Sequence, residues 1–150
     1  MKYGYITVAS AIPSVKVADA DYNIKQIESL TAQAEGKGAE IIVFPELSVT
    51  GYTCQDLFAQ QTLIEQAEMQ ILQLLDFSRK LDIICVVGAP VCIGSGLYNC
   101  AVVCQHGNIL GIVPKRYLPN YAEFYEKRWF ASVDNIVRPI SAAPAAKNVI

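Results

Sequence analysis

The amino-acid sequence predicts an α/β (α+β) domain in which helices pack on a layered sheet. Of its 150 residues, 53% are apolar, which is enough to bury the core of about one domain. Strand-like and helix-like patterns follow one another in the order β-α-β-α-β-β, which is typical of a sheet with helices packed on it. The first strand-like runs are almost wholly apolar, as expected of strands covered on both faces.

The first strand, helix and second strand occupy the residues before Pro45. Residues 3–10 (YGYITVAS) are rich in β-branched and aromatic side chains and predict a strand. Asp19 is placed to cap a helix that ends at Gly36, because apolar side chains recur between them at helical spacing. Residues 41–44 (IIVF) are continuously apolar and predict the second strand, which Pro45 ends.

The rest of the chain predicts a loop, a helix, a buried strand and a hairpin. Their ranges are 46–59 (loop), 61–80 (helix), 83–89 (strand), and 97–105 with 108–113 (hairpin, turning near His106). No linker and no internal repeat divides the sequence. We therefore expect residues 1–150 to belong to one domain.

Charge and cysteine usage disfavour several classes of protein. Twelve basic residues against 14 acidic ones give a net charge of −2, which offers no field for nucleic acid or an anionic membrane. The longest apolar stretch, residues 83–93, is interrupted by Gly88 and Pro90 and falls short of the roughly 20 residues that span a bilayer. Five cysteines without a Cys-x-x-Cys pattern indicate free thiols, and we expect a cytoplasmic protein.

Two charged residues directly follow predicted strands. Glu46 emerges from the run IIVFP and Lys115 from GIVP, at strand ends where α/β sheets place their sites. A carboxylate there can act as a general base, and a lysine can stabilise a developing oxyanion. A solvated loop carboxylate and an ordinary surface lysine are the alternatives. Glu126 lies among aromatic residues, where it belongs either to a pocket or to a solvated helix face.

Other reactive residues carry weaker signals. His106 is the only histidine and falls in a predicted turn, where a structural role is favoured over a catalytic one. Cys54 is the one cysteine in a loop, so it is a candidate nucleophile, whereas the other four occupy buried strand positions. The sequence has no metal-ligand spacing and no glycine-rich phosphate loop.

Three segments, taken in order, resemble the nitrilase (carbon–nitrogen hydrolase) superfamily. They are FPELSVTGY, PKRYLPN and FYEKRWF. Their longer forms, FPELSVTGYTCQDLF and KRYLPNYAEFYEKRWF, resemble the glutaminase domains of glutamine-dependent NAD synthetases. The resemblance extends to about Phe130 and implies part of a four-layer α-β-β-α sandwich. Residues 1–150 would then be the N-terminal part of a carbon–nitrogen hydrolase domain.

The resemblance implies roles for individual residues. The base glutamate of the family falls on Glu46, its lysine on Lys115 and its second glutamate on Glu126. The aromatic residues of the glutamine pocket fall on Tyr121, Phe124 and Tyr52. The family's nucleophilic cysteine has no counterpart in this sequence, because Cys54 lies in a motif where the family does not place it.

The same resemblance implies a larger enzyme. Glutamine would be hydrolysed, and its ammonia would pass to a synthetase domain that uses ATP and magnesium to amidate deamido-NAD. We expect homo-oligomeric assembly, and we expect these 150 residues alone to be inactive. The alternatives are a stand-alone amidase or carbamoylase of the superfamily, and a non-catalytic folding or assembly module.

Overall fold

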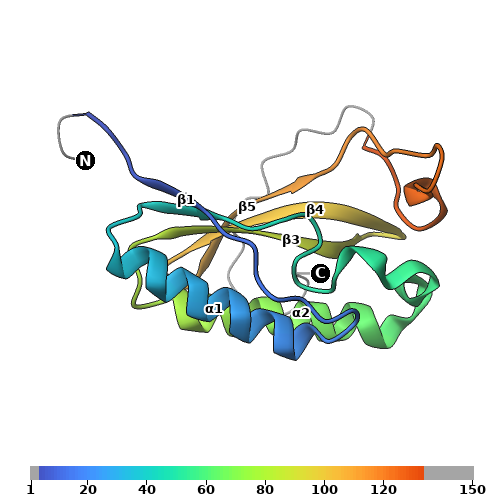
Figure 1. Cartoon of the computed structure of the whole chain (residues 1–150). Helices are drawn as coiled ribbons and strands as arrows, with labels where there is room; N and C mark the ends of the chain where they lie inside the picture. The colour runs from blue at the N-terminus through green and yellow to red at the C-terminus, as the bar shows by residue number, and fades with distance from the viewer. Residues whose placement is uncertain (1–3, 134–150) are drawn as a thin grey trace.

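The computed structural model describes residues 4–133, which form one five-stranded sheet with two helices on one of its faces (Figure 1). The strands lie in sequence order. β1 (Val8–Ser10), β2 (Ile41–Val43) and β3 (Ile84–Ile93) are parallel, and β4 (Gly96–Gln105) and β5 (Asn108–Pro114) continue the sheet as antiparallel hairpins. The order of helices and strands is β-α-β-α-β-β-β, which matches the predicted ranges but has one strand more than the predicted order β-α-β-α-β-β.

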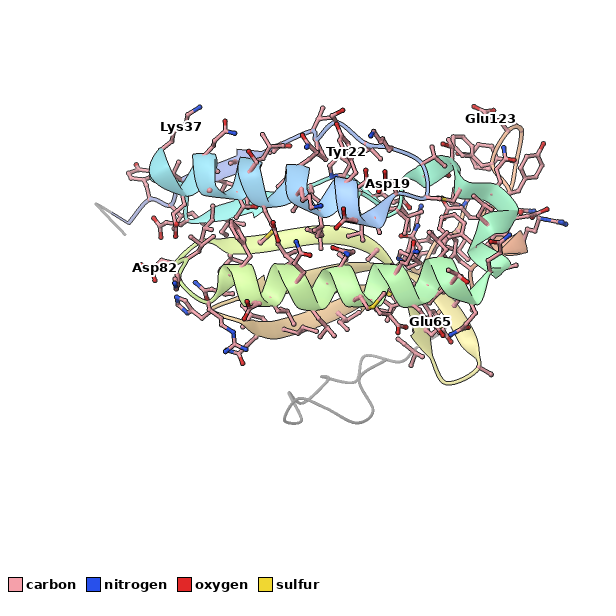
Figure 2. All side chains as sticks on the ribbon, turned by 90° about the horizontal axis from the view of Figure 1, so that it is seen from below. Asp19, Tyr22, Lys37, Glu65, Asp82 and Glu123 are labelled. Carbon is pink, nitrogen blue, oxygen red and sulfur yellow. The ribbon has the colours of Figure 1, made fainter. Side chains whose placement is uncertain are left out.

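Helices α1 (Ala20–Gly36) and α2 (Gln61–Ser78) run side by side across the sheet (Figure 2). Asp19 caps α1 as expected, because its carboxylate accepts the Tyr22 N–H at 3.1 Å. The core between helices and sheet contains fully buried aliphatic side chains, among them Ile24, Ile27 and Val87. No helix in residues 4–133 is long and apolar enough to cross a bilayer.

The strand boundaries differ from the sequence prediction for identifiable reasons. β1 spans Val8–Ser10 within the predicted range 3–10, because the three-residue strand β2 offers it only three partners. β3 continues to Ile93 instead of ending at residue 89. Pro90 is tolerated because its partner Asn99 directs its backbone carbonyl away from β3, toward β5, so no ladder bond needs the missing Pro90 N–H.

The helical segments also differ from the prediction. α2 ends at Ser78, two residues earlier than expected. The predicted loop 46–59 contains a kinked 3-10 segment, η1 (Tyr52–Ala59), and the segment after β5 contains a short 3-10 turn, η2 (Glu126–Arg128). Both figures place η1 and the segment after β5 at the same end of the sheet.

The second face of the sheet is apolar and largely uncovered by residues 4–133. Val8, Val43 and Val113 lie on it and are 56%, 39% and 61% exposed. The register aligns them with further apolar residues of the same face, namely Ile41, Val86, Ala101 and Val103. A sheet that is apolar on both faces is normally covered on both.

Candidate active site

Glu46 lies in a tight turn that crosses the second face of the sheet. The turn follows β2 through Pro45 and contains Leu47, which is buried and has a positive φ of 51°. Gly88 of β3 lies directly beneath it. A Cβ at Gly88 would be 2.2 Å from the backbone nitrogen of Leu47, so only glycine permits this approach. Hydrogen bonds also join the two segments: the Val49 N–H donates to the Gly88 carbonyl, and the Gly88 N–H to the Ser48 hydroxyl.

Lys115 directly follows β5, and its side chain meets both glutamates. Its Nζ donates to Oε1 of Glu46 at 2.6 Å and to Oε1 of Glu126 at 2.9 Å. Glu46 and Lys115 therefore meet, although β2 and β5, the strands that precede them, are separated in the sheet by β3 and β4. Burial lowers the pKa of Lys115, but the hydrogen bonds to the two carboxylates outweigh it and raise the pKa above its ordinary value. The ammonium group stays protonated at neutral pH.

Glu126 is 1% exposed, and one oxygen of its carboxylate has partners from two segments, while the buried Oε2 has none within residues 4–133. Oε1 accepts hydrogen bonds from Lys115 Nζ and from the Tyr52 hydroxyl, the latter at 2.8 Å. A buried carboxylate needs a compensating cation, and Lys115 supplies it. The pocket interpretation of Glu126 therefore holds, and the solvated helix face is wrong. Burial, and then the bond to Glu126, raise the pKa of the Tyr52 hydroxyl.

The three aromatic residues predicted to bind substrate form one cluster. The rings of Tyr52 and Phe124 are 6.5 Å apart, and those of Phe124 and Tyr121 are 5.7 Å apart, both in edge-on arrangements. Tyr121 is 69% exposed and free to contact a ligand. A cavity of about 420 Å³ is lined by Tyr52 and Phe124, but neither Glu46 nor Lys115 lines it.

An ion pair joins η1 to the segment after β5. Arg128 donates from Nε and Nη2 to the two carboxylate oxygens of Asp56 at 2.7 and 3.0 Å, and the Trp129 indole N–H donates to the same carboxylate at 2.8 Å. Hydrogen bonds from Arg128 and Trp129 lower the pKa of Asp56 to about 2. These contacts connect the motif that contains Tyr52 with the one that contains Glu126.

The remaining candidates do not reach this cluster. Cys54 is 2% exposed, packs in a small apolar core and donates its thiol proton to the Thr50 carbonyl, while burial raises its pKa. Its burial, its hydrogen bond and its raised pKa indicate that Cys54 has a structural role. His106 occupies the β4–β5 turn with a φ of 50°, as expected, and lies 2.9 Å from Asp82. All five cysteines are free, as the sequence predicted.

The sequence interpretation missed two residues that build the site. Asn99 donates from its side-chain amide to Oε1 of Glu46, and its backbone carbonyl accepts the Lys115 N–H at 2.7 Å. Gly88 permits the turn that carries Glu46. The available signals were an asparagine and a glycine inside otherwise apolar strands. Within residues 4–133, no group of three or more His, Cys, Asp or Glu side chains could hold a metal ion.

Comparisons with known proteins identify the family of the chain. The family model described as carbon-nitrogen hydrolase matches residues 7–147. The chain belongs to this family. It is 37% identical over 133 residues to a glutamine-dependent NAD(+) synthetase from Mycobacterium bovis, a match that covers 89% of the chain and 20% of the relative. The chain thus spans about a fifth of the length of that curated relative.

Solved structures give the same result for the fold. A glutamine-dependent NAD(+) synthetase from Cytophaga hutchinsonii superposes with a TM-score of 0.79 at 31% identity, over 85% of the chain and 22% of that structure. An amidase from Nesterenkonia sp. AN1, with the acetamide moiety of fluoroacetamide added covalently at its active-site cysteine, superposes with a TM-score of 0.78. It is 23% identical and is matched over 90% of this chain and 51% of its own, which shows a shared fold.

Proposed function

We propose that this chain supplies the base and the oxyanion-stabilising lysine of a glutamine amide hydrolase that belongs to a glutamine-dependent NAD synthetase. The observation that carries the proposal is the position of Lys115, which bridges Glu46 and Glu126 at 2.6 and 2.9 Å. An ammonium has three protons to donate, and the two carboxylates take two of them. The third has no acceptor within residues 4–133 and can be donated to the oxygen of a substrate amide.

Glu46 is suited to the proton transfers of this reaction. Its Oε1 accepts from Lys115 and Asn99, while its Oε2 accepts no hydrogen bond from residues 4–133. Oε2 takes the proton of a cysteine thiol, and the thiolate sulfur forms a bond to the side-chain carbonyl carbon of glutamine. That cysteine is supplied by a part of the protein outside this sequence, because Cys54 is buried and hydrogen-bonded away from the cluster.

The rest of the cycle uses the same groups. Lys115 stabilises the tetrahedral oxyanion, and removal of such a donor typically slows a reaction about 100- to 1,000-fold. The carbon–nitrogen bond breaks as Glu46 returns its proton to the nitrogen, which leaves as ammonia. Glu46 then takes a proton from water, and the hydroxide attacks the carbonyl carbon of the thioester. The carbon–sulfur bond breaks, glutamate is released, and the thiolate recovers its proton from Glu46. Glu126 holds Lys115 in place.

The proposal extends to partners and location. Ammonia passes to a synthetase domain that binds ATP and magnesium and amidates deamido-NAD. The apolar second face of the sheet supports the presence of further protein layers, because exposed residues such as Val8 and Val113 favour burial. Oligomeric assembly would bury further surface. Five free thiols support a cytoplasmic location.

The two alternatives make different demands on substrate. A stand-alone amidase or carbamoylase would hydrolyse simple amides or carbamoyl compounds and would need no synthetase domain. The 37% identity to a glutamine-dependent NAD(+) synthetase favours glutamine instead. A non-catalytic folding or assembly module does not require a lysine between two carboxylates. The position of Lys115 between Glu46 and Glu126, next to the aromatic cluster, therefore favours a catalytic role.

The test uses the complete gene product. Glutamate release from glutamine should fall at least 100-fold in Glu46→Gln and in Lys115→Met, whereas NAD formation from ammonium, ATP and deamido-NAD should stay within about twofold. Lys25→Met is the matched control, since Lys25 forms an exposed ion pair with Asp21 on α1. Turnover of acetamide or a carbamoyl compound in preference to glutamine would contradict the proposal. So would full glutaminase activity in either variant.

A further inference from the structure

Asn99 is a buried polar residue in an otherwise apolar strand. It is 3% exposed and lies on β4 among Leu97, Cys100 and Ala101. Its register partner is Pro90, which presents no N–H, so the neighbouring strand β3 does not explain why an amide is needed here. A buried amide requires hydrogen-bond partners, and those of Asn99 identify its task.

The partners of Asn99 are Glu46 and Lys115, and the contacts use both its side chain and its backbone. Nδ2 donates to Oε1 of Glu46, and the backbone carbonyl accepts the N–H of Lys115 at 2.7 Å. One residue of β4 therefore contacts the turn that follows β2 and the residue that follows β5. These two segments are 69 positions apart in sequence.

The orientation of the amide is fixed by chemistry. A carboxylate only accepts hydrogen bonds, so the nitrogen of Asn99 faces Glu46 and the amide oxygen points elsewhere. With Asn99 and Lys115 both donating to Oε1, rotation of the Glu46 carboxylate would break two charge-assisted hydrogen bonds. The position of Oε2, the oxygen proposed to take the proton of the thiol, is thereby fixed as well.

We propose that Asn99 is the positioning residue of this site, which holds Glu46 and Lys115 in a common geometry for proton transfer. The inference rests on the proposed amide hydrolysis. Asn99 acts through Glu46 and Lys115 and touches no reacting atom. The side-chain contact fixes the carboxylate, and the backbone contact fixes the start of the Lys115 side chain.

Two substitutions, one apolar and one titratable, distinguish a positioning role of Asn99 from a contribution to stability alone. Asn99→Leu keeps a similar volume and removes the donor. Asn99→Asp keeps the shape, and the introduced carboxyl donates to Glu46 only while it is protonated. Tyr98→Phe is the control on the same strand, because the Tyr98 hydroxyl makes no hydrogen bond to residues 4–133.

The kinetic test measures glutamate release from glutamine by the complete protein across pH. Asn99→Leu should lower kcat about 10- to 100-fold at every pH, with KM changed much less and with ammonium-dependent NAD formation retained. For Asn99→Asp, kcat divided by the wild-type kcat at the same pH should rise as pH falls, because protonation of the introduced carboxyl restores the donor to Glu46. Tyr98→Phe should match wild type.

Two kinetic results would overturn the inference. One is Asn99→Leu activity within twofold of wild type. The other is a ratio of Asn99→Asp to wild type that does not change with pH. Should the wild-type protein release no glutamate, the proposed function itself fails, and the crystal structure of Asn99→Leu decides the inference. The Lys115 Nζ to Glu46 Oε1 distance, 2.6 Å in the wild type, should then exceed 3.5 Å, and an unchanged distance would overturn the proposal.

Discussion

Gly88→Ala tests how tightly the turn that carries Glu46 is held against the sheet. The new Cβ would lie 2.2 Å from the Leu47 nitrogen and 2.7 Å from both the Glu46 carbonyl carbon and the Pro45 oxygen. Since a Cβ does not approach closer than 3.0 Å, the turn has to move by at least 0.8 Å. All three contacts are with backbone, so no side chain can rotate away.

The expected cost follows from this displacement. The hydrogen bonds from Val49 to Gly88 and from Gly88 to Ser48 oppose the movement, so overpacking should destabilise the chain by about 1–3 kcal/mol. A shift approaching 1 Å at a catalytic group can also lower the rate about 100-fold. We expect glutaminase activity of the complete protein to fall by roughly that factor.

Two measurements check this prediction. Urea unfolding of the chain gives the change in stability, and glutamate release by the complete protein gives the change in kcat. Gly36→Ala is the matched control, because a Cβ at Gly36, the last residue of α1, meets nothing within 4 Å. That control should be neutral or slightly stabilising. A Gly88→Ala protein with unchanged kcat and stability within about 0.5 kcal/mol of wild type would refute the reasoning.

Three further predictions address the surroundings of the site. Tyr52→Phe removes a donor from the buried Glu126 carboxylate and should destabilise the chain by about 1–2 kcal/mol in urea unfolding, whereas no change would show that the bond is dispensable. Because hydrogen bonds from Arg128 and Trp129 lower the pKa of Asp56 to about 2, the stability they provide is present above pH 4 and is lost as pH falls toward 2. Asp56→Asn should abolish this part of the acid dependence, and a carboxyl that titrates near pH 4 by NMR would contradict it. Finally, the purified 150-residue chain should release no glutamate from glutamine, as should its Cys54→Ala variant, and activity that the substitution removes would make Cys54 the nucleophile.

Much of the fold was predictable because local signals and the tertiary structure agree. Asp19 caps α1, and the apolar run at residues 41–44 forms β2, apart from its last residue. The errors in the strands occurred where a neighbouring strand decided the outcome. β1 is short because β2 is short, and β3 passes through Pro90 because Asn99 bonds toward β5.

The charged residues of the site were predictable from their positions at strand ends, whereas the residues that hold them were not. Glu46 and Lys115 follow predicted strands, and that placement marked them as candidates. The strands are not neighbours in the sheet, so only the folded chain shows that the two side chains meet. The task of Asn99 depends on three segments that meet only in the folded chain. Burial of Glu126 was likewise undecided by a sequence in which charged and aromatic residues alternate.

Covalent labelling by a diazoketone analogue of glutamine tests the central claim most directly. Such an analogue alkylates the thiolate that attacks the carbonyl carbon, so peptide mass spectrometry identifies the nucleophile. In the complete protein we predict one modified cysteine that is none of the five in this sequence, and a labelling rate about 100-fold lower in Glu46→Gln. Modification of Cys54, or labelling that is equally fast without the Glu46 carboxylate, would contradict the assignment of Glu46 as the base that activates a cysteine supplied from elsewhere.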